Sequence, residues 1–88
     1  MNAREMIKKA YGNSKNMMTS SVISYGKIGK NMAYELSWGR GIFSPDLYGV
    51  TIASVRGGAA KREDGLSTCF NKKKDAMDYI KELKRKYG

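Results

Sequence analysis

The chain has 88 residues, which is enough for one small domain with a single core and one site at most. Seventeen Lys and Arg against eight Asp and Glu give a formal net charge of +9 at pH 7, and histidine is absent. Because histidine is absent and Cys69 is the single cysteine, the sequence excludes Ser-His-Asp and Cys-His catalysis, His-ligated metals, Cys-clustered zinc and an intramolecular disulfide.

Residues 1–12 are predicted to form a short N-terminal helix. Asn2 and Glu5 stand three residues apart, the spacing of an N-cap and its reciprocal partner, and Gly12 supplies a stop. Between them an apolar stripe recurs at helical spacing, formed by Ala3, Met6, Ile7, Ala10 and Tyr11. Residues 13–21 are polar and lack periodicity, which predicts a connector.

Residues 22–70 are predicted to form an antiparallel sheet. The clearest strand runs from Met32 to Trp38, where large apolar residues alternate with small or polar ones. Further strands are expected at residues 22–28, 48–56 and 65–70. Gly57 and Gly58 are expected to open a charged loop that holds Lys61, Arg62, Glu63 and Asp64.

Residues 71–87 are predicted to form a C-terminal helix with Asn71 as its N-cap. The apolar side of this helix is formed by Ala76, Tyr79, Ile80, Leu83 and Tyr87. Residues 1–88 are therefore expected to form a single α+β domain. We expect a two-layer architecture, in which the C-terminal helix packs on one face of a three- or four-stranded antiparallel sheet and the N-terminal helix is short.

The alternation also predicts the two faces of the sheet. The face toward the C-terminal helix is expected to carry Met32, Tyr34, Leu36, Trp38, Val50 and Ile52. The other face is expected to be open and flat, with Ala33, Glu35, Ser37, Gly49, Thr51 and Ala53. These side chains are too short to read bases, so nucleic-acid contacts would have to come from sheet ends and turns. A flat open face also suits pairing with another protein or with a second copy of the chain as a homodimer.

The positive charge is unevenly distributed along the chain. Residues 1–31 carry a net +5, residues 32–60 are neutral and residues 61–88 carry +4. An excess of this size attracts polyanions, of which nucleic acid is the commonest and acidic protein surfaces are the next, although net charge can also serve solubility alone. The candidate nucleic-acid contacts are the cations of the sheet ends, the turns and the start of the C-terminal helix, namely Lys27, Lys30, Arg40, Arg56, Lys61, Arg62, Lys72, Lys73 and Lys74.

No apolar run is long enough for a secretory signal or for the roughly twenty residues of a membrane-spanning helix. A single cysteine is typical of a reducing compartment, so we expect a cytoplasmic protein with no membrane partner and no cofactor. Because Cys69 stands beside Phe70 in a predicted strand, its thiol is expected to be buried and inert.

The last forty residues, under half of the chain, resemble the arm-binding N-terminal domains of tyrosine recombinases. The matching features are Tyr48-Gly-Val-Thr-Ile52, a loop with Gly65-Leu-Ser-Thr68, Phe70, Lys73-Lys-Asp-Ala76 and Tyr79-Ile80. The resemblance implies a three-stranded sheet packed on one C-terminal helix, with strands that enter the DNA major groove. The order of elements is also similar to double-stranded-RNA-binding domains, although Met77 stands where that family has a further lysine.

These observations favour a small, non-catalytic nucleic-acid-binding protein that holds phosphates through Lys and Arg of loops and helix ends. No catalysis is expected, because Glu35 is the one carboxylate set in an apolar run and its strand position points it outward. The alternative is a small interaction or inhibitor protein, of the kind a phage or mobile element encodes, which docks on an acidic partner. The sequence leaves open whether the nucleic acid is DNA or RNA, and single- or double-stranded.

Overall fold

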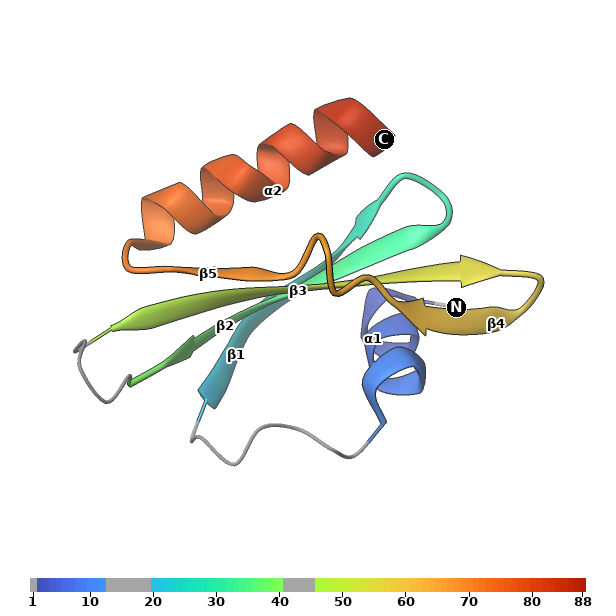
Figure 1. Ribbon diagram of the computed structural model, residues 1–88, viewed down its shortest axis with the longest axis horizontal. Helices are drawn as coiled ribbons and strands as arrows, with labels where there is room; N and C mark the ends of the chain where they lie inside the picture. Colours follow the sequence, from blue (N-terminus) through green and yellow to red (C-terminus); the bar gives the residue numbers. More distant parts are fainter. Residues whose placement is uncertain (1, 13–19, 41–45) are drawn as a thin grey trace.

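The computed structural model describes residues 2–12, 20–40 and 46–88. In chain order the elements are α1 (Ala3–Tyr11), β1 (Ser20–Ile28), β2 (Met32–Gly39), β3 (Leu47–Arg56), β4 (Ala59–Arg62), β5 (Thr68–Phe70) and α2 (Lys73–Tyr87). The five strands form one antiparallel sheet, with α2 over one face and α1 against the other (Figure 1). The predicted α+β class, the antiparallel sheet and the two terminal helices are confirmed. Residues 13–19 of the predicted connector lie outside the described residues, and its last two residues belong to β1.

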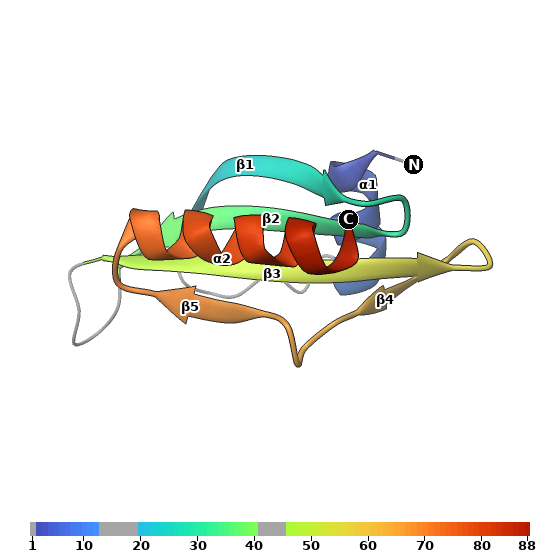
Figure 2. The same cartoon turned by 90° about the horizontal axis from the view of Figure 1, so that it is seen from above.

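Strands β4 and β5 share β3 as their partner. The strand order is β1-β2-β3-β4, and β5 pairs with the other half of β3, so that the two short strands lie along the same edge (Figure 2). Between them the backbone N–H of Glu63 donates to the carbonyl of Ile52 at 3.0 Å, and the Ile52 N–H donates to Ser67 Oγ at 3.0 Å. β4 and β5 therefore act as one edge strand that is interrupted by a turn. Hydrogen bonds to Ile52 anchor this turn to the middle of β3.

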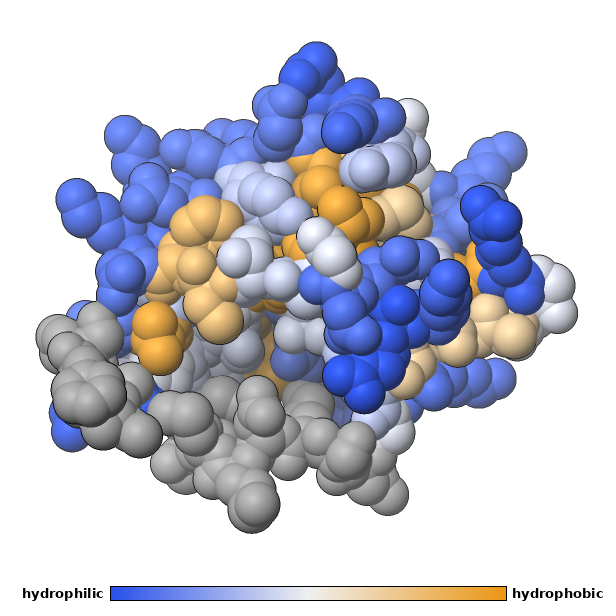
Figure 3. Space-filling view, in the orientation of Figure 1, coloured by the Kyte–Doolittle hydropathy of each residue, from blue (hydrophilic) through white to orange (hydrophobic). Residues whose placement is uncertain are grey.

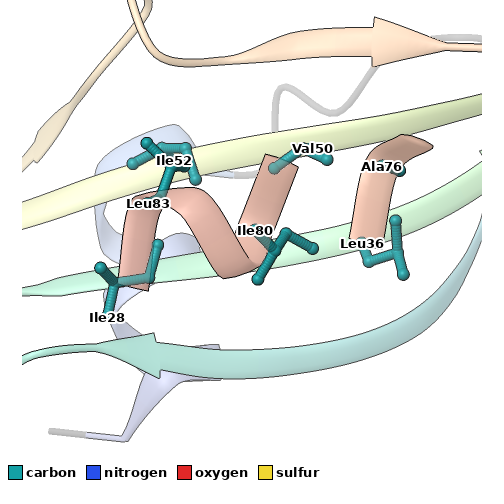
Figure 4. Close-up of a cluster of buried hydrophobic side chains, with 7 residues drawn as sticks. All are labelled: Ile28, Leu36, Val50, Ile52, Ala76, Ile80 and Leu83. Carbon is teal, nitrogen blue, oxygen red and sulfur yellow. The ribbon is translucent and has the colours of Figure 1, made fainter. Parts of the chain in front are cut away.

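The main core lies between α2 and the sheet. The side chains that fill it come from three strands and the helix (Figure 4): Ile28, Leu36, Val50, Ile52, Ala76, Ile80 and Leu83. Each is at most 5% exposed, and burial of a side chain of Val, Leu or Ile size stabilises a fold by about 1.5–3 kcal/mol. The predicted helix-facing side is confirmed at its centre, because Leu36, Val50 and Ile52 all lie beneath α2.

A second core lies under α1, on the opposite face of the sheet. It comprises Ala3, Met6, Ile7, Ala33 and Ala53. The prediction that this face is open was wrong at Ala33 and Ala53, which are both fully buried. Their small side chains let the helix approach the strands closely, so alanines on a sheet face here indicate a covering helix and not a bare surface.

Two residues of β2 also differ from the prediction. Glu35, expected to point outward into solvent, is 6% exposed. Trp38, expected to join the core beneath the C-terminal helix, is half-buried, and its Nε1–H donates to Asp46 Oδ1 at 2.8 Å. Leu36 of β2 therefore belongs to the core beneath α2, whereas Trp38, near the end of the strand, does not.

The helix starts were predicted with unequal success. Asn2 caps α1 as expected, since its Oδ1 accepts from the Glu5 N–H at 2.9 Å, and Gly12 closes the helix at a positive φ of 62°. The N-cap of α2 is Lys72 and not Asn71, and no side chain caps it. The first turn of α2 thus begins one residue later than predicted, at the second residue of the Lys72–Lys74 run.

The charged loop after residue 58 is partly a strand. Gly57 and Gly58 both have positive φ, at 56° and 82°, and form the two-residue turn of the β3–β4 hairpin. Lys61 and Arg62 therefore lie on β4 and not in a loop. The last strand starts at Thr68, and the expectation of a buried thiol was wrong, because Cys69 is exposed on this edge.

Candidate nucleic-acid interface

A groove of about 570 Å³ lies at the end of the sheet where the β1–β2 and β3–β4 turns are found. We call it the hairpin groove, and its lining residues are Ile28, Lys30, Asn31, Met32, Ser54, Val55, Arg56, Lys61, Glu63, Leu66 and Tyr87. The two turns are held at the same end because Met32 pairs with Ser54 and the Val55 N–H donates to the Asn31 carbonyl at 2.8 Å. Apolar surface shows beneath the C-terminal half of α2, with hydrophilic residues around it (Figure 3).

Three of the nine predicted contact residues meet at this groove. Lys30 comes from the β1–β2 turn, Arg56 ends β3 and Lys61 lies on β4, and all three are exposed. Lys61 stands opposite Ser54 in the β3–β4 ladder, which sets it on the α2 side of the sheet. Within the described part of the chain, none of the three forms an ion pair with a carboxylate. Their charges are therefore available to an anionic ligand.

One acidic side chain shares the groove with these cations. Glu63 is half-buried, and its Oε2 accepts a hydrogen bond from Ser54 Oγ at 2.6 Å. Its backbone is fixed too, because its carbonyl accepts from the N–H groups of Leu66 and Ser67 at 3.0 and 3.1 Å. Ser54 of β3 therefore holds the Glu63 carboxylate, and the turn that follows Glu63 holds its backbone.

The C-terminal end of α2 forms another wall. A Cβ on Gly29 would lie 2.8 Å from the Tyr87 carbonyl oxygen, so the β1–β2 turn packs directly against the last turn of the helix. This brings two further cations to the same end, since Lys84 Nζ lies 5.4 Å from the Tyr34 ring centroid and Lys86 Nζ lies 5.5 Å from that of Tyr87.

Arg85, in the same helical turn, is paired with Glu82. The hydrogen bond and charge of Arg85 lower the pKa of the Glu82 carboxyl below its ordinary value. The pair offsets one positive charge of the last helical turn and leaves those of Lys84 and Lys86.

Two predicted contacts point to the other face of the sheet. Lys27 stands opposite Ala33, the residue that α1 covers. Arg62 stands opposite Ala53, its guanidinium lies 4.8 Å from the Tyr11 ring centroid, and it is paired with Asp64 at 3.4 Å. Both residues therefore lie on the α1 side and do not join the hairpin groove.

The remaining four predicted contacts lie at the opposite end of the sheet. Arg40 follows β2 and lines a smaller hollow of about 260 Å³ together with Leu47 and Cys69. Lys72, Lys73 and Lys74 are exposed at the start of α2, whose 15 residues span roughly 22 Å. The predicted set thus divides into three groups, and three of its nine members share the hairpin groove.

Sequence reasoning missed the groove residues that are not cations. Tyr87 was placed on the apolar side of the C-terminal helix, yet it is 43% exposed and lines the groove. Ser54 and Glu63 carry no motif, and only the β3–β4 register brings them together. A hairpin signal at Gly57 and Gly58 was available and would have set Lys61 opposite Ser54.

Within residues 2–12, 20–40 and 46–88 there is no group of three or more His, Cys, Asp or Glu side chains arranged to hold a metal ion. None of the helices in these ranges has the length and apolar character required to cross a membrane. No protein-family model, curated protein or solved structure gives a significant match to the chain. The likeness to arm-binding domains of tyrosine recombinases therefore stays a prediction.

Proposed function

We propose that the protein is a small, non-catalytic nucleic-acid-binding protein that holds phosphates at the hairpin groove. The observation that carries the proposal is the convergence of Lys30, Arg56 and Lys61. The sequence separates the first and last of them by 31 positions, and the fold gathers them around one opening that Lys86 also approaches. Exposed cations that are free of carboxylate partners are suited to phosphate contacts.

The sheet itself is not part of the proposed contact surface. The face opposite α2 is covered by α1 at Ala33 and Ala53, and on the same face Ser37, Gly49 and Thr51 are small. A sheet that reads bases in a groove needs long polar side chains on its open face. The proposed mode of binding is therefore contact with the phosphate backbone, with little dependence on sequence.

The test is a salt titration of binding to labelled duplex DNA and duplex RNA, followed by fluorescence anisotropy. If the groove and its neighbouring cations neutralise about four phosphates, affinity falls about a hundredfold between 50 and 200 mM salt. Lys61→Gln should weaken binding, whereas Lys9→Gln, an exposed lysine of α1 with the same change in charge, should weaken it less. Salt-independent binding, or no binding at low salt, rejects the proposal.

A pull-down with and without nuclease addresses the alternative, a protein that docks on an acidic partner. If the protein binds nucleic acid, nuclease treatment should release whatever the pull-down has captured. Retention of one protein partner after nuclease treatment would instead favour the interaction protein, with the same cations facing acidic side chains.

A further inference from the structure

The hairpin groove has more features than phosphate contact requires. Besides its cations it has an apolar part, to which Ile28, Met32 and Leu66 contribute, and the exposed ring of Tyr87 stands at its edge. Its volume of about 570 Å³ lies within the range of about 300–1,000 Å³ that is typical of small-molecule sites. A straight phosphate backbone would leave this apolar part empty.

The single carboxylate narrows the chemistry of the ligand. Glu63 lines the groove together with three cations, so an anionic group held by those cations would be repelled wherever it came next to the Glu63 carboxylate. A carboxylate accepts several hydrogen bonds, and Ser54 supplies one of them through Oε2. The group next to Glu63 should therefore be a hydrogen-bond donor and not a phosphate.

We infer that the hairpin groove binds one unpaired nucleotide. Its phosphate would lie near Lys30, Arg56 and Lys61, its base would lie on the apolar part beside Tyr87, and the N–H groups of the base would face Glu63. A nucleotide is the ligand class that combines an anionic group, a flat apolar body and an edge of N–H donors. The inference deepens the proposed function and rests on it, since the nucleotide would belong to the strand whose phosphates the cations hold.

Two kinds of ligand would present such a nucleotide to the groove: a free mononucleotide, or an unpaired nucleotide within a nucleic-acid strand. We favour the strand, because Lys84 and Lys86 extend the positive surface beyond the groove along α2, where further phosphates can be held. Guanine is the most suitable base for Glu63, because its Watson–Crick edge presents N–H donors.

The test compares a blunt duplex with the same duplex carrying a short guanine overhang. The wild-type protein should bind the overhang duplex about tenfold more tightly, a preference within the range that stacking of one base provides. Tyr87→Ala and Glu63→Gln should each reduce this preference, measured as the ratio of the two affinities, by at least about threefold. Lys73→Gln, at the far end of α2, is the control and should weaken binding to both duplexes by the same factor.

Equal affinity for the two duplexes, or a preference that Tyr87→Ala leaves unchanged, overturns the inference and leaves the proposed function standing. A separate titration with guanosine 5′-monophosphate tests whether the groove binds a free mononucleotide. If no duplex binds but the mononucleotide saturates a site that Glu63→Gln weakens, the proposed function fails and the groove is a site for free nucleotides. If neither binds, both proposals fail. Circular dichroism and thermal unfolding of each variant confirm that the fold is retained.

Discussion

The hydroxyl of Ser67 takes the place of a strand partner at the break between β4 and β5, and its removal provides a sharp test of the fold. Ser67 Oγ accepts from the Ile52 N–H at 3.0 Å, donates to the Glu63 carbonyl at 3.0 Å and lies 3.1 Å from Tyr11 Oη. Ile52 is fully buried, so Ser67→Ala leaves its backbone N–H without a partner. The Glu63 carbonyl is affected less, because it still accepts from two backbone N–H groups.

A buried donor without a partner costs about 1–3 kcal/mol, so we expect Ser67→Ala to lower the free energy of unfolding by about 2 kcal/mol. In a domain of this size that corresponds to a fall in Tm of about 8–16 °C. Urea unfolding measures the change, with an unchanged m-value as the check that both variants unfold as two-state systems. Ser21→Ala, at an exposed position of β1, is the control and should change stability by no more than about 0.5 kcal/mol.

Tyr11→Phe extends the test, because Tyr11 Oη donates to the Ile52 carbonyl at 2.7 Å and contacts Ser67 Oγ. The two substitutions should therefore be non-additive by at least about 0.5 kcal/mol. A destabilisation by Ser67→Ala that is no larger than that of Ser21→Ala would refute the reasoning, since the Ile52 N–H would then have found another partner.

Three further predictions concern packing and pH. Gly26→Ala should lower the free energy of unfolding by about 1–3 kcal/mol, because its Cβ would lie too close to the Tyr34 ring. The effect should disappear in a Tyr34→Ala background, and a destabilisation that this background leaves unchanged would contradict the close approach. Met6→Ala, at a position 1% exposed under α1, should cost about 2–5 kcal/mol against about 0.5 kcal/mol or less for the half-exposed Met77→Ala, and equal costs would mean that α1 does not cover the sheet. Burial raises the pKa of Tyr79 above its ordinary value of 10.0, so the folded state holds that proton more tightly than the unfolded state. The corresponding stability is present below pH 10 and disappears as pH rises past the raised pKa, and denaturant unfolding between about pH 9 and 11 should show a shallower decline for Tyr79→Phe; parallel pH profiles would contradict this.

Alternation along single strands predicted the centre of the fold well. The period of two in β2 set Leu36 on the face that α2 covers, and the helical stripe of α2 set Ile80 and Leu83 against it. These patterns are local, and each element carries its own signal.

What the sequence did not predict depends on contacts between distant segments. Ala33 and Ala53 are compatible with a bare flat face or with a close-packed helix, and only the docking of α1 decides between these two arrangements. The residues of β4 have little strand character of their own, and the strand exists because the turn at Gly57 and Gly58 returns the chain along β3. The candidate site was predicted as a set of cations, but the grouping of Lys61 with Lys30 follows from strand pairing, which the order of charges along the chain does not contain.

The central claim is that the cations of the hairpin groove bind phosphates. The most direct test of this claim compares two triple variants with the same reduction in net charge. One is Lys30→Gln/Arg56→Gln/Lys61→Gln at the hairpin groove, and the other is Arg4→Gln/Lys8→Gln/Lys9→Gln on the exposed side of α1. The slope of log affinity against log salt should become shallower by about 2.7 for the groove variant, or about 0.9 for each phosphate that its side chains no longer neutralise, and should change by less than about one for the α1 variant. Equal slopes for the two variants would show that only net charge matters and would contradict a phosphate-binding groove.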